Sequence, residues 1–201
     1  MISKALNLIV NELNAYLDSL DTQSDDLVVL GNIAQYESTT GNNGQNTLQN
    51  RIVVTLINAE VEKTLKNQPN YRIVNGSTEY KKAPLYLNLY IIISSTATLY
   101  TNAMVYLSRI IQFFHSHNSF NIKSSVINNA TEARYKMDDF RLVVDLYCPS
   151  FEEINFLWST LGGKQLPSLI YKIRLIQIES EKKIGDGELI KEVKINKTQN
   201  A

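Results

Sequence analysis

The sequence predicts one domain that mixes helices and strands, of the α/β or the α+β class. Apolar residues recur at helical spacing in the first 20 residues, and three later segments, at 84–95, 140–147 and 169–178, place apolar residues at alternate positions as strands do. The length of 201 residues fits a single domain with its own core. The residues alone leave both classes open.

Two long helices and one short helix are expected. The first helix has an apolar stripe of Ile2, Leu6, Ile9, Leu13, Tyr16 and Leu20. The second, over residues 97–114, has Tyr100, Ala103, Leu107, Ile110 and Phe114, with Leu99, Met104 and Ile111 beside them. Ser150 and Glu153 match a capping box for a short helix through Trp158, and Gly162-Gly163 ends that helix.

Five strands are expected, at residues 27–37, 51–62, 84–95, 140–147 and 169–178. The second of them is apolar on both faces, which is typical of a central strand. In the last strand the alternation changes phase before Ile176 and Ile178, which predicts a bulge or two-sided burial. The inward residues of the fourth strand are Phe140, Leu142, Val144 and Leu146.

Three polar segments are expected to lie outside these elements. Residues 39–49 contain Gly-Asn-Asn-Gly and predict a loop tip, and residues 63–83 predict a long loop. Beyond residue 179 the chain becomes charged, and Gly185-Asp186-Gly187 indicates a turn. We therefore expect a domain over residues 1–179 and an extended arm or hairpin over residues 180–201.

Composition excludes several classes of function. Lys plus Arg equals Asp plus Glu at 20 each, which argues against nucleic acid as the main partner. The single cysteine, Cys148, excludes an intramolecular disulfide and fits synthesis in the cytoplasm. No segment approaches the roughly 20 apolar residues of a membrane span, so we expect no membrane insertion.

The residues predict no catalytic, cofactor-binding or metal-binding site, and hence no enzyme. His115 and His117 do not share a helix face and have no third ligand beside them. A small cytosolic enzyme that uses Cys148 and His115 is the less favoured alternative, because the position of Cys148 at the end of an apolar strand predicts a packed or half-buried thiol.

Aromatic residues supply the candidate contact sites. The chain has 11 tyrosines, and tyrosine and tryptophan are enriched at protein interfaces as well as in cores. Lys172 and Arg174 are expected on the face opposite Tyr171, as solvated residues or as an interface charge row. The candidate interface residues are Tyr86, Tyr90, Trp158, Tyr171, Lys172, Arg174, Leu189, Val193 and Ile195.

Several segments, in their order, resemble one protein family. They are Leu-Asn-Ala-Tyr-Leu at the end of the first helix, Leu-Gly-Asn-Ile-Ala at residues 30–34, Val-Thr-Leu-Ile-Asn-Ala-Glu at 54–60, Pro-Leu-Tyr-Leu-Asn-Leu-Tyr at 84–90, Ile-Gln-Phe-Phe at 111–114 and the run from Leu157 to Arg174. From about residue 2 to 178 the chain is similar to cap, or tail-terminator, proteins of phage-tail-like contractile injection systems of the antifeeding-prophage type.

The resemblance implies an α+β, tail-terminator-like fold, in which helices flank a mixed sheet. It implies a structural protein that forms a homo-oligomeric, six-fold ring at the baseplate-distal end of the particle. The ring would contact the inner tube protein and the sheath protein, within a particle that is assembled after cytoplasmic synthesis and is released or anchored. An adaptor or terminator elsewhere in a phage-tail-like particle is the alternative.

Two hypotheses concern the segments outside the expected core. The arm at 180–201, with alternating Leu189, Val193 and Ile195, would add a strand to the sheath subunits. The loops at 39–49 and 63–83 would face the tube or the lumen of the ring.

Overall fold

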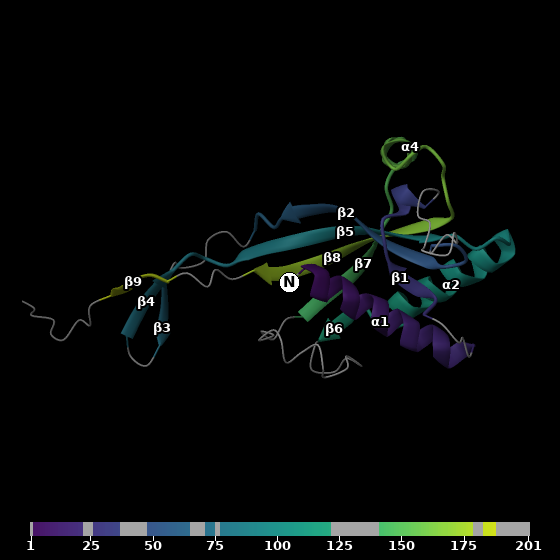
Figure 1. The fold of residues 1–201 in the computed structure, drawn as a ribbon. Coiled ribbons are helices and arrows are strands. Elements are labelled where there is room, and N and C mark those ends of the chain that lie inside the picture. The colour runs from purple at the N-terminus through teal and green to yellow at the C-terminus, as the bar shows by residue number, and fades with distance from the viewer. Residues whose placement is uncertain are drawn as a thin grey trace, which may run out of the picture.

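A six-stranded sheet lies between two layers of helix in the computed structural model (Figure 1). The structure describes residues 2–21, 26–36, 48–64, 71–74, 77–121, 141–178 and 183–187. In chain order the elements are α1 (Ile2–Leu20), β1 (Val28–Leu30), the 3-10 turn η1 (Ile33–Gln35), β2 (Ile52–Val61), β3 (Tyr71–Val74), β4 (Ser77–Lys81), β5 (Leu85–Ser95), α2 (Tyr100–Ser116), β6 (Ser119–Asn121), β7 (Arg141–Tyr147), α4 (Phe151–Thr160), β8 (Ser168–Ile178) and β9 (Lys183–Gly187).

The strand order of the large sheet is β1-β2-β5-β8-β7-β6. Strand β1 is parallel to β2, and the other neighbours are antiparallel. This mixed sheet with its helices confirms the α+β class. Four of the predicted strands are confirmed as β2, β5, β7 and β8. In β7, Leu142 and Val144 are buried as predicted, but Leu146 near the end of the strand is 49% exposed.

The predicted bulge is present in β8. Leu87 pairs with Ile176 and Leu89 with Ile173, so β8 has one more residue than β5 over this interval. A second bulge lies in β2, where Leu56 pairs with Ile91 and Asn58 with Tyr90. The change of phase in the sequence therefore reports a real irregularity of the ladder.

Helices α1 and α2 cover one face of the sheet and bury the larger core. Their rings meet those of the sheet, since the centroids of Phe114 and Tyr171 are 4.5 Å apart. The predicted stripe of α2 is wrong at Leu99, Tyr100 and Ile111, which are exposed, and it omits Phe113, which is buried. Phe113 turns inward because it packs against Tyr16 of α1, at 5.0 Å between ring centroids.

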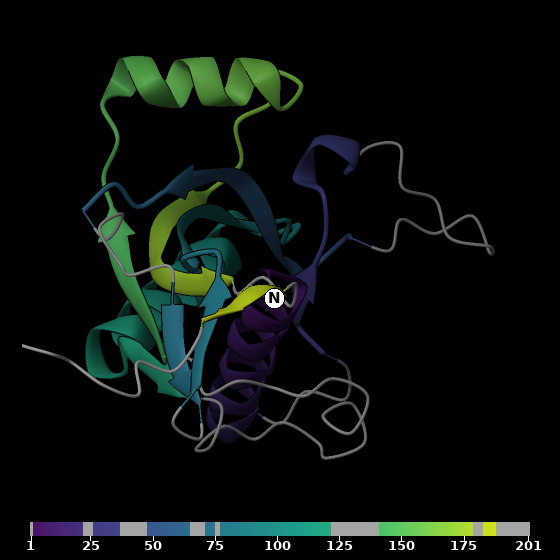
Figure 2. The ribbon, with the colours of Figure 1, turned by 90° about the vertical axis from the view of Figure 1, so that its left-hand side faces the viewer.

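Helix α4 and η1 lie over the opposite face, as Figures 1 and 2 show. Trp158 of α4 packs in a smaller core with residues such as Val53 and Ile92 of the sheet. The capping box is confirmed: Ser150 Oγ accepts a hydrogen bond from the Glu153 backbone N–H, and the Glu153 carboxylate accepts one from the Ser150 N–H. Gly162 and Gly163 follow the helix with φ of 108° and 82°.

The predicted strand at 27–37 is wrong beyond Leu30. Thr55 Oγ1 donates to the Gly31 carbonyl at 2.7 Å and accepts from the Ile33 N–H at 3.1 Å, which turns the chain away from β2. The Asn32 side chain then accepts a hydrogen bond from the Ala34 N–H and caps η1. Side-chain hydrogen bonds thus replace the ladder after three residues.

The predicted loop at 63–83 is also wrong, because it contains β3 and β4. These strands form a three-stranded sheet with β9, in the order β3-β4-β9. The predicted turn at Gly185-Asp186-Gly187 is instead part of β9, where Gly185 pairs with Tyr80. Figure 1 shows this small sheet set apart from the large one, beyond the start of β5 and the end of β8.

Some predicted features lie outside the described residues. They are the loop tip at 39–47, Phe140, and the three alternating residues Leu189, Val193 and Ile195. The division of the chain at residue 179 stays a prediction.

Candidate interaction surface

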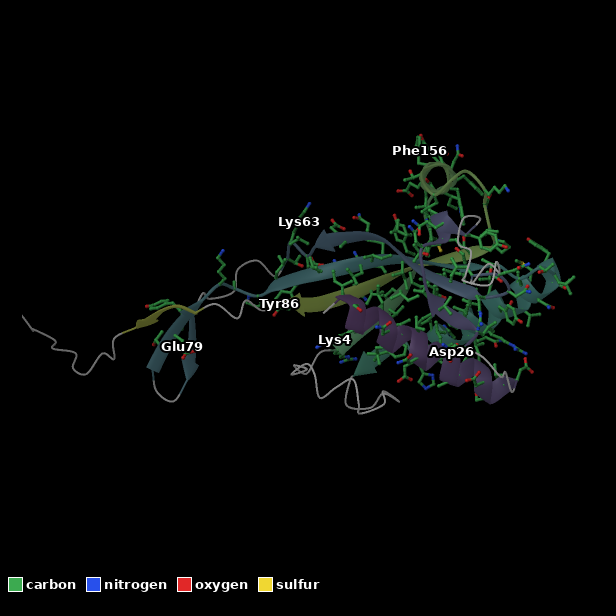
Figure 3. All side chains as sticks on the ribbon, viewed as in Figure 1. Lys4, Asp26, Lys63, Glu79, Tyr86 and Phe156 are labelled. Atoms are coloured by element: carbon green, nitrogen blue, oxygen red, sulfur yellow. The ribbon has the colours of Figure 1, made fainter. Side chains whose placement is uncertain are left out.

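One face of the large sheet is only partly covered, and several predicted contact residues lie there. Helix α4 and η1 cover this face near Val53 and Ile92. Towards Lys63 and Tyr86, no described helix lies over it (Figure 3). The exposed and half-buried residues of this part are Asn58, Glu60, Glu62, Tyr86, Tyr90, Asp145, Tyr147, Lys172 and Arg174, with Asn88 buried among them, and we call this surface the polar sheet face.

The strand register places these residues on one face. Glu60 pairs with Asn88, Tyr90 with Lys172, and Lys172 with Asp145. Residues that are directly opposite in antiparallel strands point to the same side of the sheet. Tyr86, Tyr90, Lys172 and Arg174, which were predicted separately, therefore belong to one surface.

The side chains of the polar sheet face hold one another in place. The Tyr90 hydroxyl donates to Glu60 Oε2 at 3.2 Å, and the Tyr90 and Tyr147 rings meet edge to face at 5.4 Å. Lys172 Nζ lies 5.3 Å from the centroid of the Tyr90 ring. Such contacts reduce the entropy that ordering these side chains would cost when a partner binds.

One ion pair and one carboxylate supply further fixed charges. Arg174 Nε lies 2.6 Å from Asp145 Oδ2. Glu62 accepts hydrogen bonds from the Thr64 hydroxyl, the Asn88 amide and the Thr64 backbone N–H, which hold its pKa to about 2, with a smaller contribution from the Lys172 charge. Glu62 is therefore ionised at neutral pH.

A groove of about 420 Å³ opens where α4 meets this face. It lies between α4, the segment before α4 and the sheet. Its lining residues are Ile57, Asn58, Glu60, Tyr90, Tyr147, Pro149, Glu153, Leu157 and Ile170.

Two of the predicted contact residues lie in the cores instead. Trp158 is 6% exposed and Tyr171 is 2% exposed, so neither offers a surface to another subunit. Burial, followed by the nearby Cys148, raises the pKa of Tyr171 above its ordinary value. Residue type alone did not distinguish core from surface, because both sites use aromatic side chains.

The edges of the large sheet are short or blunted. Strands β1 and β6 have three residues each. Strand β2 continues past its pairing with β1, but it is bulged there, and the Asn58 side chain accepts a hydrogen bond from the Ala59 N–H at 2.8 Å. Short and bulged edges disfavour the addition of a strand at these positions.

The structure shows where Cys148 and His115, the two residues of the alternative enzyme site, lie. The prediction of a packed or half-buried thiol is wrong, because β7 ends at Tyr147 and Cys148 is exposed just beyond it. His115 is exposed in the last turn of α2. Within the described ranges, no three His, Cys, Asp or Glu side chains are grouped as metal ligands would be. In the same ranges, no helix has both the length and the apolar character to cross a membrane.

Comparison with solved structures shows a shared fold. The chain is similar to the sheath/tube terminator of the extracellular contractile injection system PVC in its extended state, with a TM-score of 0.57 over 94% of this chain and 12% identity. It is also similar to the tube-terminating cap of the anti-feeding prophage, with a TM-score of 0.54 over 99% of this chain and 13% identity. The chain spans 63% and 61% of the lengths of these two proteins.

Sequence comparison identifies the family. No curated protein sequence matches the chain. The family model of the Pvc16 N-terminal domain matches residues 5–192. The match extends over most of the chain and agrees with the resemblance noted from its segments. The chain therefore belongs to the Pvc16 N-terminal domain family.

Proposed function

We propose that this chain is a structural cap that ends the inner tube and the sheath at the baseplate-distal end of a contractile injection particle. The observation that supports this most is the fold it shares, over 94% and 99% of its length, with a sheath/tube terminator and a tube-terminating cap. Membership of the Pvc16 N-terminal domain family supports it independently. A catalytic role is not part of the proposal.

A cap has to end the growth of a polymer, and a closed ring does this. In a ring each copy uses one surface toward its neighbour and presents no free copy of that surface for another layer. The proposed ring contains six copies, as the sequence resemblance implies. Its partners are the tube protein on one side and the last layer of sheath on the other.

The polar sheet face is the proposed contact surface within this ring. It presents tyrosines and an arginine, which are enriched at protein interfaces. Its charges are mixed, with Glu60, Glu62 and Asp145 beside Lys172 and Arg174, so it suits a partner surface with the complementary pattern.

The small sheet is the proposed element for reaching a neighbouring layer. It stands apart from the large sheet, and Glu79 on it is far from the helices in Figure 3. Residues 183–187 already pair with β4, so the strand proposed for the sheath is restricted to residues 188–201. Truncation after residue 187 should keep the ring and lose sheath attachment, and normal sheath binding by that variant would refute the arm hypothesis.

Electron microscopy of particles from cells that lack the gene tests the function. Loss of the cap should give tubes and sheaths that are overlong, frayed or absent, and supplying the gene should restore them. Particles of normal length with closed ends would contradict the proposal. The Cys148→Ala variant should also restore the particles, which would exclude the enzyme alternative because that alternative requires the thiol.

A further inference from the structure

The groove beside α4 has a lining that differs in charge from the rest of the polar sheet face. Glu60 and Glu153 contribute two carboxylates, and none of its lining residues is Lys, Arg or His. The other lining side chains are apolar, aromatic or an amide. The groove is therefore complementary to a positive charge carried on an apolar stem.

The arrangement fits arginine in particular. Ile57, Leu157 and Ile170 supply apolar surface for the methylene groups of such a side chain. Tyr147 supplies an aromatic wall for a planar cation, and its ring meets Tyr90 edge to face. The guanidinium group has five N–H donors in one plane, which suits two carboxylates and a ring better than the compact ammonium of lysine does.

Both carboxylates keep acceptor capacity after their internal hydrogen bonds are counted. Glu153 accepts from the Ser150 N–H at 2.8 Å, and Glu60 accepts from the Tyr90 hydroxyl at 3.2 Å. An ionised carboxylate has about four lone-pair sites, so each retains sites for a ligand. The internal bonds fix the two carboxylates in position.

The cation beside Tyr90 is not part of the groove lining. Lys172 Nζ lies 5.3 Å from the centroid of the Tyr90 ring, and Lys172 is not among the lining residues. Its charge acts on Glu62, whose pKa it helps to lower. Glu60 and Glu153 thus leave the groove with an excess of negative charge.

We infer that this groove binds an arginine side chain that a partner protein supplies. The inference concerns the isolated chain and does not depend on the capping role. It identifies the kind of partner residue that docks on the α4 side of the polar sheet face.

The test is a titration of the full chain with N-acetyl-arginine amide, followed by two-dimensional NMR. The neutral isostere N-acetyl-citrulline amide, at matched ionic strength, is the ligand control. Saturable shifts at Tyr90, Tyr147 and Leu157 are expected with arginine, with a Kd in the millimolar range that suits one side chain, about −4 kcal/mol at 1 mM. Citrulline should bind at least roughly fivefold more weakly, because it lacks the charge.

Matched variants locate the site. Glu60→Gln and Glu153→Gln should each weaken arginine binding by about three- to tenfold, because a neutral amide replaces a charge-assisted acceptor. Gln at position 153 still serves a capping box, so α4 should remain folded. Glu152→Gln changes a carboxyl on the same helical turn outside the groove lining and should leave binding unchanged.

The inference is overturned by any of three results. These are equal shifts with citrulline, unchanged binding by the Glu60→Gln, Glu153→Gln double variant, and shifts that map away from the groove. Glu60 lies on β2 and not on α4. If Glu153→Gln loosens the helix, arginine binding by the Glu60→Gln variant is therefore the deciding measurement.

Discussion

The side chain of Asn14 on α1 forms two hydrogen bonds with the backbone of Val28 on β1. Asn14 Nδ2 donates to the Val28 carbonyl, and the Val28 N–H donates to Asn14 Oδ1, both at 2.8 Å. Asn14 is only 7% exposed. The amide therefore takes the place of a neighbouring strand for the edge strand β1 and joins the helical layer to the sheet.

Asn14→Ala should destabilise the fold by about 2–4 kcal/mol, because it leaves two buried backbone groups of Val28 without partners. Urea unfolding measures the change. Asn11→Ala, at an exposed position of the same helix, is the control and should change stability by less than about 0.5 kcal/mol. Equal effects of the two substitutions would show that the bonds to Val28 contribute nothing specific.

Trp158→Ala should release α4 from the sheet. Trp158 is 6% exposed and is the buried residue of this helix, so its truncation should cost about 3–5 kcal/mol of local stability. Hydrogen exchange of the α4 amides measures this directly. Phe156→Ala removes a ring of the same helix that is 64% exposed, and it should leave exchange nearly unchanged. Loss of protection in both variants would contradict the assignment of Trp158 as the anchor.

Glu62 should contribute stability that is lost in acid. Its pKa is about 2 in the fold and 4.5 in the unfolded chain. Above pH 4.5 the carboxylate is ionised in both states and its hydrogen bonds stabilise the fold. As the pH falls from 4.5 toward 2, only the unfolded chain takes up the proton, and this stabilisation disappears.

The comparison of wild type with Glu62→Gln tests this linkage. The difference in unfolding free energy should be constant above pH 4.5 and should shrink between pH 4.5 and 2. Urea unfolding at a series of pH values measures it, with Glu152→Gln as the control. A difference that does not vary with pH would refute the role of the Thr64 and Asn88 hydrogen bonds.

Charge reversal on the polar sheet face should affect assembly more than folding. Arg174→Glu breaks an ion pair whose side chains are 47% and 39% exposed, so the cost to stability should be below about 1 kcal/mol. In cells without the native gene, this variant should fail to restore particles of uniform length. Arg109→Glu is the control, because it breaks the Arg109–Asp21 ion pair on the helical side of the sheet. This variant should restore particles of uniform length. Full rescue by both variants would remove the face from the proposed ring contacts.

Local patterns in the sequence predicted the elements whose own spacing of apolar residues shows which face is buried. Strands β5 and β8 alternate over a long interval, and α1 has a continuous stripe, so the core specifies them directly. The end of β1 was missed because Thr55, more than 20 residues away, bonds Gly31 and Ile33. Strands β3 and β4 pair with each other on either side of Asn75-Gly76, a hairpin signal in the sequence that the loop prediction did not use. Strand β9 was missed because its partner β4 lies about 100 residues earlier in the chain.

The candidate surface was predicted in part, for a similar reason. Tyr86, Tyr90, Lys172 and Arg174 were identified by type, but only the pairing register shows that they share a face. Glu60 and Asp145 were not predicted, because their neighbours come from other strands. Tyr171 was misplaced because its ring fits the core beside Phe114 as well as it would fit an interface.

The central claim is that this chain caps one end of the particle, and imaging of a labelled chain tests it most directly. A small tag would be added to the chain in cells that make particles, and the purified particles would be imaged by electron microscopy with a tag-specific gold probe. The account predicts one cluster of label per particle, at the end opposite the baseplate. Label along the sheath, or at the baseplate, would contradict it.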